Sequence, residues 1–133
     1  MRVVLDANVL IAAIATRGLC EAVLEICLQH HDLVLCPGIL DEVEGKLGGK
    51  LKLPAPLIRN FLGLLRNHSH MVDPEAVPPD ACRDPKDLMV LGLVEPGRVE
   101  VIVSGEKDLL SIGTFKTARI QNPRGFWESL GTT

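Results

Sequence analysis

The feature that most constrains the fold is a short apolar segment near the start of the chain that ends in an acid. Residues 3–5 read Val-Val-Leu and are followed directly by Asp6. An apolar run without alternation is typical of a strand buried on both faces, as in a parallel sheet. Such sheets bind ligands beyond the carboxyl ends of their strands, where Asp6 is expected to lie. An Asp here also suits a helix cap or a turn with Asn8, so this stretch alone leaves both interpretations open.

The rest of the chain alternates between strand-like and helix-like segments. Strands are predicted at residues 3–5, 33–36, 70–72, 99–104 and 119–120. Helices are predicted at residues 9–15, 19–29, 39–47, 57–65, 85–94 and 123–130, and Pro37-Gly38 is expected to stop the second strand. The apolar stripes expected to face the core are Leu57, Ile58, Phe61, Leu62, Leu64 and Leu65 in the fourth helix, and Phe126, Trp127 and Leu130 in the last. This alternation, without an internal repeat, predicts an α/β protein whose parallel strands are joined by right-handed crossovers.

Length and composition narrow the class of protein. The 133 residues predict one domain spanning 1–133. No segment has the roughly 18–20 apolar residues of a membrane span, and the start lacks a signal-peptide pattern. Four isolated cysteines without a C-x-x-C pair predict reduced thiols in a cytoplasmic protein. The net charge of −3 does not indicate a polyanionic partner, and the scarcity of aromatic residues argues against recognition by base stacking.

Acidic residues recur at the predicted strand ends and helix starts. They are Asp6, Glu42, Asp84, Asp87 and Glu106, with Asp108 two residues further on. Each alone has a structural explanation, as a helix cap, a macrodipole partner, a turn residue or a solvated helix position. Together they are expected in one crevice, where their mutual repulsion favours a bound divalent cation. Oxygen-only ligands favour Mg²⁺ or Mn²⁺ over zinc.

Four segments carry a resemblance to a known family. They read VVLDANVL at 3–10, LDEV at 40–43, RDPKD at 83–87 and VSGEKDLL at 103–110. In this order and spacing the chain resembles the PIN-domain family, particularly its toxin-like (VapC-like) members from toxin–antitoxin systems. The resemblance covers nearly the whole chain and implies a three-layer α/β/α fold with a central parallel sheet of about five strands.

The resemblance also implies a function and a set of metal ligands. It implies a Mg²⁺- or Mn²⁺-dependent endoribonuclease that hydrolyses single-stranded RNA, forms a homodimer and is inhibited by a cognate antitoxin. Asp6 corresponds to the central metal ligand, and Glu42 and Asp87 to the second and third carboxylates. Asp84 corresponds to a supporting cap or a further ligand.

One position departs from the family pattern. Glu106 stands where the family usually has Asp, and its extra methylene displaces the carboxylate. The implied alternatives are that Glu106 binds the metal through water or that Asp108 replaces it. Asn8 and Ser104 correspond to residues that hydrogen-bond the ligands and orient them.

The charge distribution suggests where a nucleic acid would bind. Residues 45–72 contain no acid but carry five basic residues. Three of them, Lys46, Lys50 and Lys52, are predicted to bind RNA phosphates. For Arg59 and Arg66, a solvated helix face explains the charge equally well.

Two other functions remain open. A non-catalytic RNA- or protein-binding module would explain Glu106 as the trace of a lost metal site. A receiver-like phosphoryl-transfer domain also gathers acids at strand ends, but the D-x-N of residues 6–8 disfavours it because D-x-D is expected there.

Overall fold

The computed structural model describes residues 1–131, so the last two residues of the predicted 1–133 domain lie outside the described part. Residues 1–131 form a six-stranded sheet in the order β3-β2-β1-β4-β6-β5. The strands are β1 (Arg2–Leu5), β2 (Asp32–Leu35), β3 (Ser69–Met71), β4 (Val101–Val103), β5 (Thr114–Phe115) and β6 (Ala118–Gln121). Strands β1 to β4 and β6 pair in parallel, and β5 pairs antiparallel with β6. The prediction of a parallel α/β sheet is confirmed, with one strand more than the five expected.

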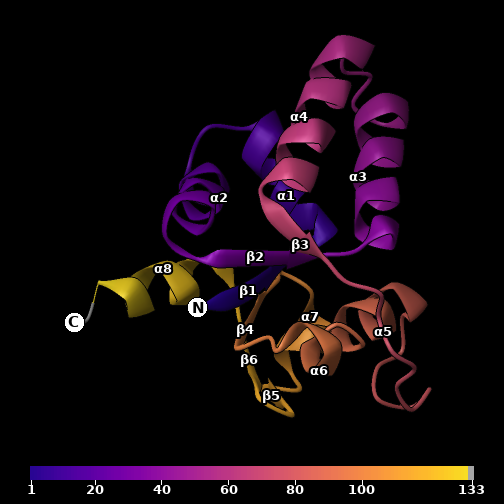
Figure 1. Cartoon of the computed structure of the whole chain (residues 1–133), viewed down its shortest axis with the longest axis vertical. Helices are drawn as coiled ribbons and strands as arrows, with labels where there is room; N and C mark the ends of the chain where they lie inside the picture. The colour runs from indigo at the N-terminus through magenta and orange to yellow at the C-terminus, as the bar shows by residue number, and fades with distance from the viewer. Residues whose placement is uncertain (132–133) are drawn as a thin grey trace.

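Eight helices connect and cover these strands within the same residues. They are α1 (Ala7–Ala15), α2 (Leu19–His30), α3 (Pro37–Gly49), α4 (Ala55–Asn67), α5 (Pro85–Leu91), α6 (Val94–Gly97), α7 (Lys107–Leu110) and α8 (Pro123–Leu130). Helices α1 to α4 gather on one side of the sheet, and α5 to α7 lie on the other (Figure 1). Helices therefore cover both faces of the sheet and shield the strands from water, as a parallel sheet requires.

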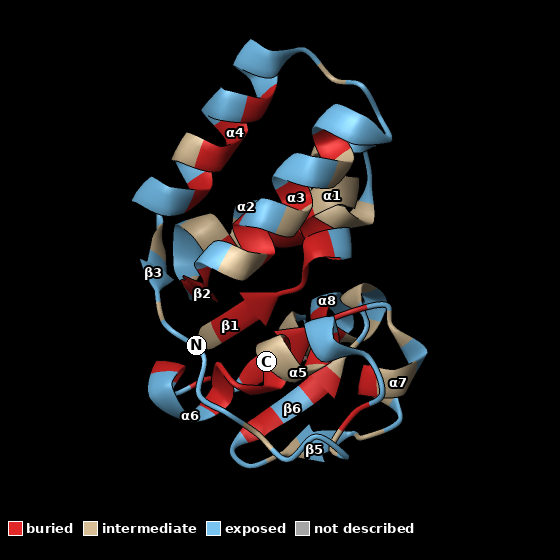
Figure 2. Cartoon of the chain, turned by 90° about the vertical axis from the view of Figure 1, so that its right-hand side faces the viewer, coloured by how far each residue is buried: buried red, intermediate tan, exposed pale blue. Residues whose placement is uncertain are grey.

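The core lies where the sheet meets these helices. The last three residues of β1, the last three of β2 and all of β4 are buried. Figure 2 shows this buried interior along β1 and on the inner faces of α3 and α4, while their outer faces are exposed. Because β1 is central in the sheet, its carboxyl end lies deep in the molecule, and the residue that follows it is held firmly.

Several helix boundaries differ from the prediction by a few residues. Helix α3 begins at Pro37, which the sequence had indicated as a strand stop, because proline suits the first turn of a helix. The helix predicted over 85–94 ends at Leu91, with Gly92 as its cap. A separate short helix, α6, then includes the Glu95-Pro96-Gly97 segment that was expected to follow the helix.

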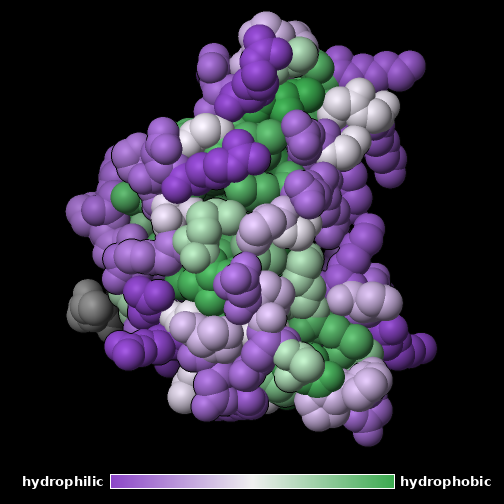
Figure 3. Space-filling view, turned by 45° about the vertical axis from the view of Figure 1, so that its right-hand side comes forward, coloured by the Kyte–Doolittle hydropathy of each residue, from purple (hydrophilic) through white to green (hydrophobic). Residues whose placement is uncertain are grey.

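Some predicted core positions are exposed. Leu57 and Leu64 on α4 are 44% and 41% exposed, whereas the neighbouring Ile58, Phe61 and Leu65 are buried. Apolar surface is visible among polar side chains in the upper half of Figure 3, where α3 and α4 lie. On α8, which was predicted to bury its aromatic pair, Phe126 is buried but Trp127 is 42% exposed.

Two further predictions concern cysteines and membranes. All four cysteines, which lie within the described residues, are free thiols, as predicted. No helix within residues 1–131 has the length and apolar character needed to cross a membrane.

Candidate functional site

The strand order places two segments from opposite ends of the chain side by side. The chain moves from β1 outward through β2 to β3, and then returns to the other side of β1 with β4. Parallel sheets bind ligands at such a reversal, beyond the carboxyl ends of the two central strands. Asp6 directly follows β1 and Ser104 directly follows β4. The amide of Asp6 donates to the carbonyl of Val103 at 3.1 Å, which fixes the two strand ends together.

Asp6 is a helix cap and a pocket residue at once. Its Oδ1 accepts a hydrogen bond from the amide of Val9 at 3.1 Å, which caps α1. Its Oδ2 accepts a short hydrogen bond from the hydroxyl of Ser104. Burial raises the pKa of Asp6, the negative charges of Glu106 and Glu42 add to the rise, and the two hydrogen bonds oppose it. A cation beside Asp6 would therefore relieve an electrostatic cost already present in the protein.

Asp87 reaches the same region from the first turn of α5. Asp84 caps this helix by accepting from the amide of Lys86 at 2.9 Å, and Pro85 occupies the first turn. Asp87 is 7% exposed, and the Cys82 thiol donates to its Oδ2 at 3.7 Å. Burial, followed by the negative charge of Asp84, raises the pKa of Asp87 to about 6.

These acids line one pocket of about 90 Å³ at the carboxyl end of the sheet. Its polar lining comprises Asp6, Asn8, Glu42, Lys46, Asp84, Lys86, Asp87 and Glu106. Figure 2 looks onto this side of the molecule, where β1 ends between α3 and α5. Four segments that are distant in the sequence therefore contribute side chains to a space the size of a few water molecules.

A chain of polar contacts crosses this pocket. The Lys46 ammonium donates to Asn8 Oδ1 at 3.0 Å and pairs with Glu42 Oε2 at 3.3 Å. The side-chain amide nitrogen of Asn8, Nδ2, donates to Glu106 Oε1 at 2.5 Å. Asn8 thus orients Glu106, and Lys46 orients Glu42. The backbone amide of Glu106 also donates to the hydroxyl of Ser104 at 3.0 Å, which ties the loop after β4 to Asp6.

Asp108 does not belong to this pocket. It faces Arg83, with 3.5 Å between Asp108 Oδ1 and the guanidinium, and lines a separate hollow. Helix α7 begins at Lys107 and directs Asp108 toward Arg83, so this arrangement does not support Asp108 as the substitute for Glu106, and that role stays a prediction.

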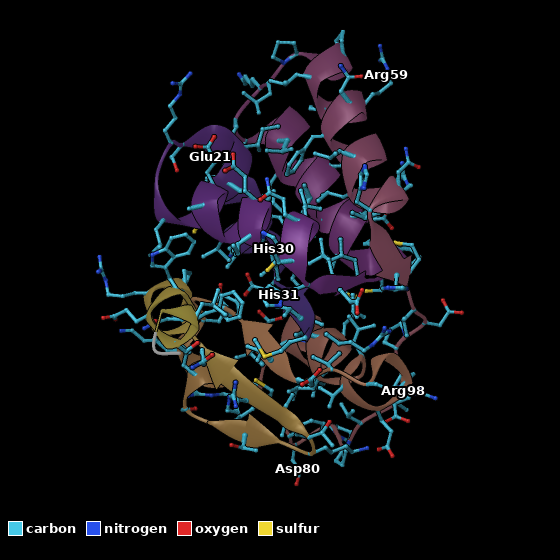
Figure 4. All side chains as sticks on the ribbon, turned by 60° about the vertical axis from the view of Figure 1, so that its left-hand side comes forward. Glu21, His30, His31, Arg59, Asp80 and Arg98 are labelled. Atoms are coloured by element: carbon cyan, nitrogen blue, oxygen red, sulfur yellow. The ribbon has the colours of Figure 1, made fainter. Side chains whose placement is uncertain are left out.

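The basic residues of segment 45–72 occupy different places. Lys46 lines the pocket, whereas Lys50 and Lys52 are exposed at and beyond the end of α3. Lys50 follows Lys46 by four residues, so both project from one face of that helix. Arg59 lies near the start of α4, at the top of Figure 4, and is remote from His30 and His31 at the end of α2.

Two pocket features were missed in the sequence. The Lys46 contacts with Glu42 and Asn8 were not anticipated, although the i, i+4 spacing of Glu42 and Lys46 was a visible signal. The Cys82 contact with Asp87 depends on the turn before α5, and an isolated cysteine gives no such signal.

The donor set suits a hard divalent cation, because it consists of carboxylate and amide oxygens. Within residues 1–131, however, no three His, Cys, Asp or Glu side chains converge closely enough to hold one ion in this arrangement. The contacts explain this: Glu42 is turned toward Lys46, and Glu106 toward Asn8. By donor chemistry and by their place in one pocket, these acids still suit a divalent cation.

The comparison with protein families decides the family. A family model described as a PIN domain matches residues 2–108, which covers every acid of the pocket. The chain belongs to the PIN-domain family. The match confirms the resemblance drawn from the four sequence segments.

Solved structures agree with this PIN-domain fold. The crystal structure of VapBC2 from Rickettsia felis bound to a DNA fragment from their promoter matches with a TM-score of 0.64. The match covers 92% of this chain and 98% of that one, at 14% sequence identity, so it shows a shared fold. A comparison with curated protein sequences gives no significant match.

Proposed function

We propose that this PIN domain is a Mg²⁺- or Mn²⁺-dependent endoribonuclease that cleaves single-stranded RNA. The observation that carries the proposal is the gathering of Asp6, Glu42, Asp87 and Glu106 around one small pocket. Burial, with the charges of neighbouring acids in addition, raises the pKa of Asp6 and of Asp87, and a divalent cation would offset the cost of their ionised forms.

Each residue has a distinct part in the proposed reaction. Asp6 and Asp87 would hold the ion, with Glu42 and Glu106 as further ligands and Asp84 as the cap that fixes Asp87. Ser104 and Asn8 would keep Asp6 and Glu106 in place through the hydrogen bonds described above. A bound ion supplies positive charge to the scissile phosphate and lowers the pKa of an attacking water.

The remaining residues would bind the substrate. Lys50 and Lys52 are exposed at and just beyond the end of α3, the helix that contributes Glu42 to the pocket. This position suits contacts to successive phosphates of a single strand. Such contacts are made to the RNA backbone and do not depend on the base sequence of the RNA.

The proposal includes a partner and a compartment. We propose a cognate antitoxin, supported by the family resemblance and by the fold shared with the VapBC2 structure. A homodimer follows from the resemblance alone. The four free thiols support a cytoplasmic location, where thiols stay reduced.

The decisive experiment compares the natural chain with Asp6→Asn. Asparagine still caps a helix but carries no charge, so the variant should fold and lose the metal ligand. Purified proteins are incubated with single-stranded RNA and Mn²⁺, with single-stranded DNA of the same sequence in parallel. Asp41→Asn is the matched control, because Asp41 is exposed on the same helix as Glu42.

We expect RNA cleavage by the natural chain and by Asp41→Asn, and none by Asp6→Asn. Cleavage by all three proteins, or by none at high protein concentration, would defeat the nuclease proposal.

A non-catalytic RNA- or protein-binding module is the second candidate. It is favoured because Glu106 is engaged by Asn8 and no three acids of the described residues converge on one ion. RNA binding by the natural chain without cleavage, unaffected by Asp6→Asn, would support this candidate instead.

A further inference from the structure

Lys46 places a positive charge inside the acidic pocket. Its ammonium contacts Glu42 at 3.3 Å and Asn8 at 3.0 Å, and Asn8 in turn donates to Glu106. The side chain is only partly exposed, at 36%, and Glu42 is 16% exposed. One lysine therefore neutralises one glutamate directly and, through Asn8, is linked to the second.

The four carboxylates of the pocket differ in their partners. Glu42 pairs with Lys46, and Glu106 accepts from Asn8. Asp6 feels the negative charges of Glu106 and Glu42, and Asp87 feels those of Asp84, Glu106 and Asp6. Neither Asp6 nor Asp87 has a Lys or Arg partner among the ion pairs of the described residues.

We propose that Lys46 supplies a resident positive charge beside Glu42, so that the pocket binds one divalent ion, at Asp6 and Asp87 with the remaining oxygens of Glu42 and Glu106, and excludes a second. This inference rests on the proposed function and specifies its metal stoichiometry. Four carboxylates could hold two ions, but a second ion beside Glu42 would have to displace the ammonium or lie against it. Lys46 would then have a different function from the exposed Lys50.

The test measures the number of Mn²⁺ ions bound and not the activity. Mn²⁺ is titrated into the natural chain, Lys46→Met and Lys50→Met, and free Mn²⁺ is followed by electron paramagnetic resonance. Methionine retains most of the side-chain length and removes the charge. Lys50→Met is the matched control, because it removes a charge one helical turn further along the same face.

We expect one bound ion in the natural chain and in Lys50→Met, and two in Lys46→Met. The first ion should also bind roughly tenfold more tightly to Lys46→Met, since removal of a nearby positive charge favours a cation. A further variant, Lys46→Arg, keeps the charge and should bind one ion, which separates the charge effect from a packing effect.

Two ions in the natural chain would overturn the inference and leave the nuclease proposal standing. So would one ion of unchanged affinity in Lys46→Met. A natural chain that binds no Mn²⁺, like Asp6→Asn, would overturn both.

Discussion

Asp87→Asn should stabilise the protein when metal is absent. Burial and the charge of Asp84 raise the pKa of Asp87 from 3.8 to about 6, so its ionised form is disfavoured in the folded chain. Between those two pH values the folded chain holds a proton that the unfolded chain has lost. Stability therefore falls as pH rises through this window and stays reduced above about pH 6.

The magnitude follows from the size of the shift. A rise of roughly 2 pH units corresponds to about 3 kcal/mol, at about 1.4 kcal/mol per unit. Asp84 is exposed, so solvent screens part of its effect. We therefore expect Asp87→Asn to raise the free energy of unfolding by about 1–2 kcal/mol at neutral pH.

The assay is urea unfolding in EDTA at neutral pH and near pH 4. The advantage of Asp87→Asn should be present at neutral pH and should largely close near pH 4, where folded wild-type Asp87 is protonated. Asp41→Asn, at an exposed position of α3, should stay within about 0.5 kcal/mol of the natural chain. A variant no more stable than the natural chain at neutral pH would refute the electrostatic reasoning.

Adding Mn²⁺ should make the natural chain more stable than Asp87→Asn. A ligand that binds the folded state stabilises it by about 2.7 kcal/mol at a hundred times its dissociation constant. The natural chain should gain this stability, and Asp87→Asn should gain little because it lacks a proposed ligand. An equal gain in both proteins would place the ion elsewhere.

Two further predictions concern the support of the site. Ser104→Ala should lower the free energy of unfolding by about 1–3 kcal/mol, because buried Asp6 loses the hydroxyl that donates to it. Urea unfolding at neutral pH measures this change, and an unchanged midpoint would contradict the prediction. Gly92→Ala should cost about 1–3 kcal/mol, because its Cβ would collide with the carbonyl oxygen of Glu75. Gly45→Ala, a helical position with no neighbour within 4 Å, should instead gain about 0.5–1 kcal/mol in thermal or urea unfolding. A loss in both glycine variants would show that the collision is not the cause.

The location of the pocket could be inferred from the sequence because it follows from local pattern and topology. An apolar run that ends in Asp6 predicts a buried strand, and parallel strands bring their carboxyl ends to one edge. Asp84 and Pro85 predicted the start of α5 because capping is a local interaction. The roles of these residues in metal binding remain a prediction.

Other features depend on contacts between distant segments. Helix α5 ends at Leu91, and the carbonyl of its cap, Gly92, accepts from the amide of Glu75 at 2.9 Å; no local signal encodes that partner. Strand β5 has two residues and was missed, since so short a strand has no periodicity. Trp127 was predicted to be buried because the apolar pattern of α8 does not reveal how wide the buried face is.

The two edges of the sheet have a consequence for behaviour at high concentration. Within residues 1–131 the outer strands are the shortest or nearly so: β3 has three residues and β5 has two. The chain after β3 soon reaches Pro74, Pro78 and Pro79, which lack the amide hydrogen that strand pairing needs. Exposed edge strands are templates for amyloid-like growth. Edge strands as short as these leave few free backbone groups with which another strand could pair. The sheet that gathers the pocket acids at its carboxyl end thus has side edges too short to favour aggregation.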